Sequence, residues 1–457
     1  MTQPAPLHAS QRIAVIGSGI SGMAAAWYLS AQHEVTLFES AERLGGHTAT
    51  IDVEADGKAY AIDTGFIVFN DWTYPHFQRL LETLGVATQP TEMSFSVHET
   101  EVDFEYNGHT LTSLFAQRRN LLNPAFYRLL GDIVRFNREA TQDLDNERLP
   151  AGTTLGEYLD RNRYGEAFQR RYLLPMGAAI WSASIDDLRA FPLTFFVRFF
   201  RNHGLLSISN RPQWYTLVGG SKAYIPALTA PYASRIRLNA PVSAVHRDST
   251  GVTVTSPAGE ERFDQVVLAC HSDQALAMLK DASAAEREIL GAMPYQDNEV
   301  VLHTDTRLLP RRKRAWASWN YRLDQRDAGE RVSVTYDMNI LQRLEANTTF
   351  CVTLNDSESI DPDKVLGRFV YAHPQFTLDG YAAQKRHSEI SAAPATFGRT
   401  HFCGAYWRNG FHEDGVWSAL RVARALGCDE AATPPEMSPA LPAHELMPET
   451  GVGDGLG

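Results

Sequence analysis

The chain has 457 residues and a formal net charge of −12, with 44% hydrophobic and 21% charged residues. This length is sufficient for two or three domain-sized units with a large core, and the hydrophobic share is ordinary for a soluble globular protein. The excess of acidic residues excludes wholesale binding of nucleic acid, although it leaves room for local basic patches.

Cysteine usage and hydropathy narrow the class of protein further. The four cysteines are scattered and form no CxxC pair, so we predict neither a disulfide framework nor a metal site. No run of about 18 uncharged apolar residues predicts a membrane-spanning helix. We therefore expect a cytoplasmic protein, with residues 431–457, which are rich in proline, glycine and acids, forming a disordered tail.

The first predicted elements form a βαβ unit. Residues 12–17, "RIAVIG", are typical of a buried parallel strand, and "GMAAAWYLS" after it is rich in helix formers. A second strand, "EVTLFE", ends at Glu39. Gly17, Gly19 and Gly22 between the first strand and the helix complete the pattern G-x-G-x-x-G, which in this context predicts a dinucleotide site.

Each residue of the pattern has a physical role. Gly17 permits the tight turn, Gly19 lets the backbone approach a pyrophosphate, and Gly22 lets helix and strand pack closely. The phosphates would meet the positive end of the helix, whose first N–H groups lack internal partners. Glu39 could accept hydrogen bonds from a ribose diol, and its charge disfavours the 2′-phosphate of NADP.

The stretch "ESAERLGGH" (residues 39–47) resembles the extended fingerprint of the flavin amine oxidase and phytoene desaturase superfamily. The resemblance implies FAD rather than NAD, with Arg43 and the twin glycines beside the FAD diphosphate and ribityl chain. "AIDTGFIVF" (residues 61–69) also resembles this family, as a strand and a glycine-containing turn passing near the flavin.

Later motifs resemble the same superfamily. Residues 217–228 would lead back into the FAD domain, and the backbone around Val242 and Val245 would clamp the adenine edge. Residues 401–427 resemble the closing motif, in which a strand ends at Gly404 and a helix begins near Asp414 or Gly415. We expect Asp414 to be the N-cap, although "GFHEDGV" carries one residue more than the usual amine oxidase pattern.

The superfamily resemblance implies an α/β fold: a Rossmann-like FAD-binding domain with an inserted α+β substrate domain. We place the discontinuous FAD domain at 1–88, 215–290 and 395–430, and the substrate domain at 89–214 and 291–394. FAD is expected to be non-covalent. The residues expected to contact it are Gly17, Gly19, Ile20, Ser21, Gly22, Glu39, Ser40, Arg43, Gly45, Gly46, Thr64, Gly65, Val242, Val245, Gly404, Asp414, Gly415 and Val416.

The two inserts differ in their patterns. The first is predicted to be largely helical, because "SLFAQRRNLLNPAFYRLLGDIVRFNREATQDL" has a long apolar–polar periodicity. The second alternates polar and apolar residues in three stretches typical of antiparallel strands. We expect a sheet carrying alternating aromatics, capped by helices, to roof the flavin, with substrate entering between the domains.

Four short stretches, "SWNY", "VTYDMNILQ", "YAHPQF" and "GFHEDG", resemble a bacterial amine-oxidase-like branch associated with unsaturated or methylated fatty acyl chains, including furan fatty acid synthesis. This implies an FAD-dependent oxidoreductase that desaturates or isomerises an acyl chain by hydride transfer to flavin N5. The alternatives are a flavin amine oxidase producing hydrogen peroxide and a non-catalytic FAD-binding protein. No motif identifies the electron acceptor.

Candidate catalytic residues are few, because the flavin carries the chemistry. His412 is the candidate base or proton relay, or else a histidine packed against the flavin. Lys222 could order a water near N5, or be a solvated surface lysine. Phe411 matches one aromatic of the amine oxidase cage, and a phenylalanine there favours an apolar substrate. The other pocket candidates are Tyr371, Trp407, Trp319 and Tyr321.

Two stretches suggest contact with lipid. Residues 191–206 interleave aromatics with arginines, and residues 308–319 place four basic residues beside tryptophans. Basic charge near aromatics suits an anionic membrane interface, so we hypothesise a peripheral contact with the inner membrane. The alternative is that the aromatics belong to the core and the basic turn is merely solvated.

Overall fold

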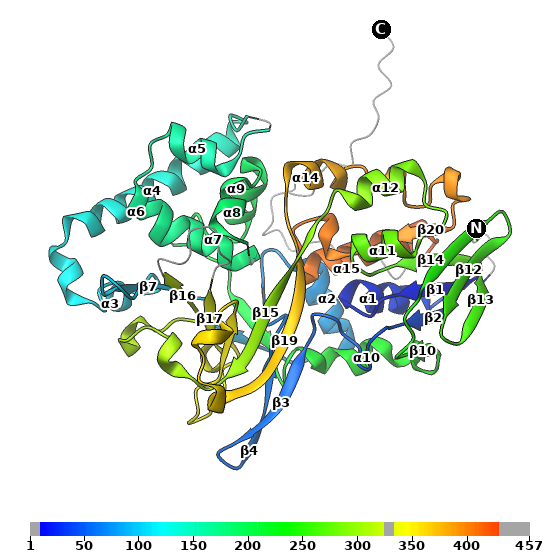
Figure 1. Cartoon of the computed structure of the whole chain (residues 1–457), viewed down its shortest axis with the longest axis horizontal. Helices are drawn as coiled ribbons and strands as arrows, with labels where there is room; N and C mark the ends of the chain where they lie inside the picture. The colour runs from blue at the N-terminus through cyan, green and yellow to red at the C-terminus, as the bar shows by residue number, and fades with distance from the viewer. Residues whose placement is uncertain (1–9, 151, 182, 208, 324–332, 429–457) are drawn as a thin grey trace, which may run out of the picture.

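A computed structural model describes residues 10–150, 152–181, 183–207, 209–323 and 333–428. Figure 1 shows two lobes side by side: a parallel sheet with its helices on the right, and a mixed sheet with a helical cap on the left. We call them the nucleotide lobe and the cap lobe. The predicted tail at 431–457 lies outside the described residues.

The nucleotide lobe is organised by a five-stranded sheet of order β10-β2-β1-β14-β20, in which every neighbouring pair is parallel. The strands are short apolar runs. The neighbouring strands β1, β14 and β20 are largely buried, as expected of a sheet covered on both faces. They come from widely separated parts of the chain: β1 (Arg12–Ile16), β2 (Glu34–Phe38), β10 (Ile236–Arg237), β14 (Gln265–Leu268) and β20 (Thr400–Phe402).

Helices and a small antiparallel sheet complete this lobe. The first helix, α1, packs closely along the last, α15, although almost 400 residues separate them in the chain. The remaining elements are the helices α2, α10, α11 and α12 and the strands β11–β13. Their bounds are α1 (Ile20–Leu29), α2 (Pro75–Leu84), α10 (Ile225–Thr229), α11 (Ser272–Met278), α12 (Ala284–Gly291), α15 (His412–Ala425), β11 (Ala244–Asp248), β12 (Gly251–Ser256) and β13 (Gly259–Phe263).

Two small sheets occur between segments of the two lobes. One is the antiparallel pair β3–β4, and the other has the order β5-β9-β6. The second sheet brings strands from before and after the helical insert together. Their bounds are β3 (Thr50–Ala55), β4 (Lys58–Asp63), β5 (Val68–Asn70), β6 (Thr88–Thr91) and β9 (Trp214–Leu217).

The cap lobe contains a seven-stranded sheet of order β19-β15-β18-β17-β16-β7-β8. All pairs are antiparallel except β7–β16, which joins the first insert to the second. The prediction of antiparallel strands in the second insert is confirmed. The strands are β7 (Phe95–Glu99), β8 (Phe104–Asn107), β15 (Tyr295–His303), β16 (Trp319–Leu323), β17 (Val334–Asp337), β18 (Cys351–Leu354) and β19 (Val365–Pro374).

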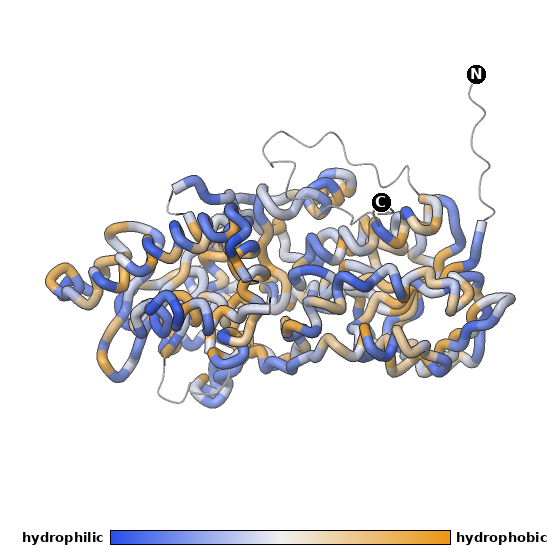
Figure 2. The backbone as a smooth tube through the Cα atoms, turned by 90° about the horizontal axis from the view of Figure 1, so that it is seen from above, coloured by the Kyte–Doolittle hydropathy of each residue, from blue (hydrophilic) through white to orange (hydrophobic). Residues whose placement is uncertain are grey.

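The first insert is largely helical, as predicted. In Figure 2 hydrophilic and hydrophobic residues alternate along the helices at the left, the pattern of helices with one buried face. The helices are α3 (Leu111–Leu114), α4 (Pro124–Asp145), α5 (Leu155–Arg161), α6 (Glu166–Phe168), α7 (Leu174–Trp181), α8 (Ile185–Arg189) and α9 (Leu193–Asn202). Two further helices, α13 (Met338–Leu341) and α14 (Leu378–Gln384), belong to the second insert.

The aromatic residues of 191–206 lie in the core of the cap lobe. Phe196 and Phe200 on α9 are fully buried and stack with their ring centroids 4.0 Å apart, and Trp181 packs 4.7 Å from Phe199. This stretch therefore does not supply aromatics to a membrane interface, and that part of the hypothesis is wrong. Among the described residues, no helix combines the length and apolarity needed to cross a bilayer.

Candidate functional site: a glycine-lined crevice

The carboxyl ends of β1, β14 and β20 meet at one edge of the parallel sheet, because neighbouring parallel strands point the same way. Gly17, Cys270 and Gly404 follow these strands within two residues. In open α/β sheets, ligands bind in the crevice outside the carboxyl ends of the strands. The predicted glycines therefore lie where this fold places a ligand.

The three glycines of the first loop occupy three different environments. Gly17 has φ +103°, and a Cβ atom on it would lie 2.9 Å from the carbonyl oxygen of Ala269. A Cβ atom on Gly22 would lie 1.9 Å from the carbonyl oxygen of Gly17. At Gly19 a Cβ atom would meet nothing within 4 Å. The backbone is thus packed tightly on the protein side of the loop and faces open space at Gly19.

Two helices begin at this crevice. Gly19 is the N-cap of α1, and no side chain caps that helix. Gly415, in the first turn of α15, lies against it: a Cβ atom there would be 2.7 Å from Cγ2 of Ile20 and 2.8 Å from Oγ of Ser21. The uncapped N–H groups at the start of α1 suit an anion such as a pyrophosphate. Val416 follows Gly415 and is fully buried.

Glu39 follows β2 and reaches the first loop. Its Oε2 accepts hydrogen bonds from the Ser18 backbone N–H at 3.0 Å and the Ser18 hydroxyl at 2.6 Å. Its Oε1 accepts from the Ala41 N–H at 2.8 Å and from the exposed Ser40 hydroxyl at 3.2 Å. The carboxylate therefore orders the glycine loop, besides any contact with a ribose.

The second glycine loop touches the first. Gly45 donates its N–H to the carbonyl of Ser18 at 3.1 Å, and a Cβ atom on Gly46 would lie 3.3 Å from Cα of Gly19. Arg43 donates to the carbonyls of Gly46 at 3.0 Å and Thr48 at 3.2 Å. Arg43 thus closes its own loop rather than extending away from it, which the sequence did not indicate.

Thr64 and Gly65 line the next turn. A Cβ atom on Gly65 would lie 2.1 Å from the carbonyl oxygen of His47, so only glycine fits. The Thr64 hydroxyl is 2.8 Å from the Tyr371 hydroxyl, which links the turn to β19 of the cap lobe. The predicted pocket residue Tyr371 therefore does lie beside the cofactor loops.

The segment between β10 and β11 runs alongside Glu39. Ala240 donates its N–H to the carbonyl of Glu39 at 2.8 Å. Val242 follows two residues later and is half-buried, whereas Val245 on β11 is fully buried. The segment is thus adjacent to the acidic residue expected to hold the ribose.

The final helix begins at His412, two or three residues before the predicted start at Asp414 or Gly415. The N-cap of α15 is Phe411, and Asp414 is the third helical residue, whose carboxylate accepts the Phe411 N–H at 2.9 Å. The prediction of Asp414 as N-cap is wrong, because its side chain reaches back to the cap residue from inside the first turn. Burial raises the pKa of Asp414 to about 6. Gly404 donates its N–H to Ser418 Oγ at 2.9 Å, which fixes β20 to this helix.

His412 is enclosed by protein groups. Its ring stacks on Phe66 with centroids 3.5 Å apart, and Nε2 lies 3.1 Å from the Thr48 hydroxyl and 3.3 Å from the Tyr224 hydroxyl. Burial holds the pKa of His412 well below its ordinary value, so the ring is neutral. These contacts favour support of the 43–48 loop over proton transfer to a substrate.

Lys222 and Trp407 lie away from the aromatic pocket. Lys222 Nζ pairs with Asp52 at 2.5 Å, with 41% and 68% of the two side chains exposed, which favours the surface alternative. Trp407 packs with Tyr406 and His387 in a core cluster of the nucleotide lobe. The assignment of Trp407 to the substrate pocket is therefore corrected, because its ring is buried on the sheet side.

Phe411 lies at the junction of the two lobes and packs against the core clusters of both. Its ring stacks on Phe199 of α9 with centroids 5.2 Å apart and lies 6.0 Å from the ring of His203. Trp319 and Tyr321 are two residues apart on β16, and both pack in the same core cluster of the cap lobe. The wall beyond Phe411 is therefore aromatic.

Sequence reasoning missed a cluster of three histidines. The ring of His47 lies 5.3 Å from that of His373 and 6.0 Å from that of His271, and 5.4 Å from the ring of Tyr371. Burial and the two neighbouring rings lower the pKa of His47 to about 3. Its Nε2 is buried without a hydrogen-bond partner. The three residues come from three separate motifs, so no local pattern could have grouped them.

The described residues contain no group of three or more His, Cys, Asp or Glu side chains arranged as a metal site. The crevice instead has the properties that a dinucleotide requires: an open position at Gly19, an uncapped helix start and an acid at the end of the second strand. The fold and site define a dinucleotide-binding protein with a separate cap lobe.

Comparison with known proteins identifies the family. The sequence model of the flavin containing amine oxidoreductases matches residues 20–345, and the chain belongs to this family. The family implies FAD as the cofactor, and the residues at the crevice fit it. The fold prediction and the predicted resemblance are thereby confirmed.

Curated relatives cover part of the chain. A Mycobacterium tuberculosis protein named as a flavin-containing monoamine oxidase is 28% identical over 275 residues, 56% of each chain. Bovine amine oxidase [flavin-containing] B is 27% identical over 253 residues, 53% of this chain and 46% of its own. The chain thus matches about half the length of these relatives.

Solved structures share the fold. Cyclohexylamine oxidase from Brevibacterium oxydans superposes with a TM-score of 0.64 and 16% identity, covering 93% of this chain and all of its own. A fatty acid isomerase from P. acnes that produces CLA superposes with a TM-score of 0.65 and 16% identity, covering 91% and 99%.

Proposed function

We propose that this FAD-dependent oxidoreductase acts on a fatty acyl chain, which it desaturates or isomerises. The observation that carries the proposal is the aromatic group at the lobe junction, where half-buried Phe411 stacks on Phe199, and Trp181 and Phe376 are buried behind it. We propose that Phe411 presents apolar surface to methylene groups; none of these rings holds a charge that would pair with a protonated amine. A fatty acid isomerase with the same fold is consistent with such a substrate.

The chain's own residues have three tasks in this chemistry. Bound FAD supplies the two-electron oxidation of a C–H bond. The two glycine loops hold the cofactor against the start of α1, and the aromatic wall excludes water and orients the acyl chain. Desaturation also releases a proton from the carbon next to the one that loses hydride, so it needs a base. Isomerisation that removes a hydride and returns it at another carbon releases no proton and needs none.

His47 is the base that we propose. Its Nε2 is buried without a protein hydrogen-bond partner, and its backbone belongs to the second glycine loop. The pKa of His47, lowered to about 3, makes the ring a weak proton acceptor, so the proposal rests on the position of Nε2. His412 is less suited, because its Nε2 already contacts Thr48 and Tyr224. The proton leaving the acyl chain would be taken up at Nε2 of His47.

Variants separate these two histidines. If the reaction is desaturation, we expect His47→Gln to slow it about 10²- to 10⁴-fold, the range for loss of a general base, while FAD remains bound. His412→Gln is expected to lower thermal stability and FAD retention instead. Equal loss of FAD in both variants would assign His47 to cofactor binding and contradict the role of base.

Amine oxidation is the second candidate, because both named relatives are amine oxidases. Mass spectrometry of the lipids that copurify with the holoenzyme, and of acyl lipids incubated with it, tests the choice. Desaturation predicts products lighter by two hydrogens, and isomerisation predicts equal mass with a moved double bond. Unchanged acyl lipids together with peroxide production from amines would overturn the proposal.

A further inference from the structure

Helix α3 lies at the left of Figure 1, at the end of the cap lobe. Exposed apolar side chains occur on α3 and on the segment that follows it. Leu122 is 88% exposed, Leu111 78%, Tyr127 49% and Leu121 43%. We call these four residues the end patch. Leu121, Leu122 and Tyr127 also line an open hollow of about 770 Å³. Such a concentration at a protruding end differs from the single exposed apolar residues found elsewhere on a surface.

Basic side chains surround the end patch. Arg118, Arg119 and Arg128 are exposed beside it, and the 310-helical turn at Lys313–Ala315 packs against α3. That turn belongs to the predicted basic run at 308–319. Eight basic residues oppose four acids, Glu101, Asp103, Glu105 and Asp132, so the region is positive on a chain of net charge −12. The eight are Arg118, Arg119, Arg128, Arg135, Arg311, Arg312, Lys313 and Arg314.

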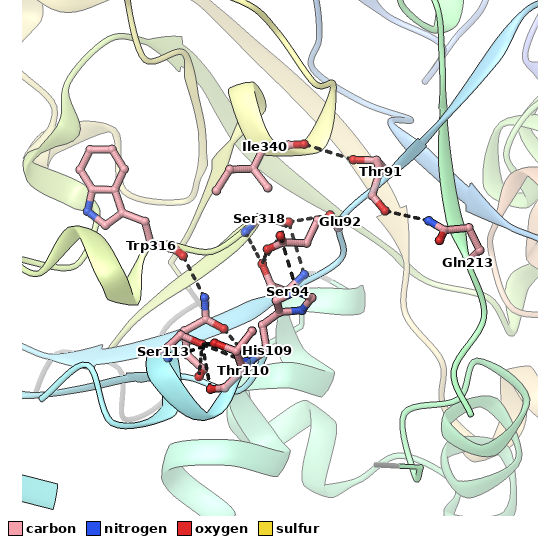
Figure 3. A network of polar contacts seen from close by, with 11 residues as sticks. Thr91, Glu92, Ser94, His109, Thr110, Ser113, Gln213, Trp316, Ser318 and Ile340 are labelled. Atoms are coloured by element: carbon pink, nitrogen blue, oxygen red, sulfur yellow. Dashed lines mark hydrogen bonds and ion pairs between the residues drawn. The ribbon is translucent and has the colours of Figure 1, made fainter. Parts of the chain in front are cut away.

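A polar network around Ser94, Thr110, Ser113, Trp316 and Ser318 joins the backbone of the basic run to the start of α3 (Figure 3). Asn107 donates Nδ2–H to the carbonyl of Trp316 at 2.8 Å, which joins β8 to the basic run. Ser318 donates its hydroxyl to the carbonyl of Glu92 at 2.7 Å. Thr110 caps α3 by accepting the Ser113 N–H at 3.1 Å. These bonds hold the basic run beside α3.

We propose that the end patch and its basic surroundings dock on an anionic phospholipid bilayer. Leucine and tyrosine side chains at this end would enter the interface while the arginines meet lipid phosphates. The remaining acidic surface would be repelled by the same bilayer, which orients the lobe. A second copy of the chain is a poorer occupant, because two copies of this positive end would face each other.

Vesicle flotation of the FAD-loaded full chain tests the proposal. We expect flotation with vesicles of phosphatidylcholine mixed with phosphatidylglycerol, and not with phosphatidylcholine alone. Leu122→Glu is expected to lower the bound fraction at least tenfold. The paired substitution Arg118→Glu and Arg128→Glu is expected to lower it similarly, and salt should weaken binding of the native chain because the charges are exposed.

Matched controls are available on other faces. Val370, 64% exposed on β19, provides Val370→Glu, and the exposed Arg287 on α12 provides Arg287→Glu. Both are expected to float like the native chain, with unchanged melting temperature and flavin absorbance in all variants.

Two outcomes would overturn the proposal: a native chain that stays in the soluble fraction with anionic vesicles, or controls that lose binding as much as Leu122→Glu does. Self-association that Leu122→Glu abolishes, without flotation, would assign the end patch to a protein contact. Flotation requires no turnover, so its failure is distinguishable from failure of the acyl-chain proposal.

Discussion

The glycine-lined crevice is formed by backbone contacts, whereas the aromatic wall at the lobe junction is formed by side-chain contacts. At Gly17, Gly22 and Gly65 backbone packs directly on backbone, and even one methyl group would collide with a carbonyl. At Phe199, Phe200 and Phe411 side chain packs on side chain. Backbone contacts demand glycine at fixed spacing, whereas an aromatic wall can be assembled in many ways. The cofactor can therefore be predicted from the sequence much more readily than the substrate can.

The largest effect on stability is expected for a substitution among the packed aromatic side chains of the cap lobe. Phe200→Ala in the cap lobe should lower the free energy of unfolding by about 3–5 kcal/mol, because it leaves a cavity at a fully buried site. Phe200→Leu keeps more of the volume and should cost less, about 1.5 kcal/mol. Denaturant unfolding measures both. Equal losses of unfolding free energy in the two variants would show that the aromatic wall tolerates no change of side chain, as the crevice tolerates none at its glycines.

Substitutions in the glycine loop test the backbone contacts of the crevice in the same way. Gly22→Ala should destabilise the protein by about 1–3 kcal/mol and release FAD, because its Cβ atom would lie 1.9 Å from the Gly17 oxygen. Gly19→Ala should preserve the melting temperature, since its φ of −62° suits alanine and its Cβ atom meets no protein atom. It should still weaken FAD binding by occupying the open space. Flavin absorbance and thermal melting separate the two effects, and unchanged FAD affinity in Gly19→Ala contradicts the placement of the cofactor.

Asp414 offers a pH-dependent test at the lobe junction. Burial raises the pKa of this carboxyl from 3.8 to about 6, so the folded state binds its proton more tightly than the unfolded state does. Its stabilising contribution is complete below about pH 4 and is lost as the pH rises through 6. Asp414→Asn removes this dependence and still accepts the Phe411 N–H.

Between pH 4 and pH 7, the unfolding free energy of Asp414→Asn should therefore rise relative to that of the native chain by up to about 2–3 kcal/mol. Unfolding free energies measured at both pH values test this. The same difference at the two pH values would show that Asp414 does not titrate in this window.

The smallest effect is expected at Lys222. Lys222→Met should change stability by less than about 1 kcal/mol, because its pair with Asp52 is largely exposed. It should leave flavin reduction by substrate unchanged. A large loss of reduction rate would restore the predicted role of Lys222 near the flavin.

Much of the nucleotide lobe could be predicted because its constraints are local. The glycine pattern, the strand before it and Glu39 lie within 28 residues, and the superfamily resemblance connects them to FAD. The N-cap of α15 lies three residues before the predicted Asp414, because Asp414 caps from inside the helix and an added residue shifts the motif. The boundaries drawn for the two domains remain predictions.

The substrate side depends on contacts between distant segments. His47, His271 and His373 meet only after three loops converge, and Tyr371 reaches Thr64 across 307 residues. Periodicity indicates that α9 has an apolar face and not what that face covers, so the sequence left both a membrane interface and the core open for this stretch. Burial confirms the core alternative. Burial, rather than composition, separates that stretch from the exposed end patch.

Anaerobic titration of the FAD-loaded enzyme tests the central claim most directly, by following the visible absorbance of the flavin. The account predicts that an unsaturated or methyl-branched acyl lipid alters the flavin spectrum, by bleaching it when the chain is desaturated and by a smaller perturbation when it is isomerised. Primary amines are expected to leave the spectrum unchanged. Bleaching by amines with no response to acyl lipids would contradict the account.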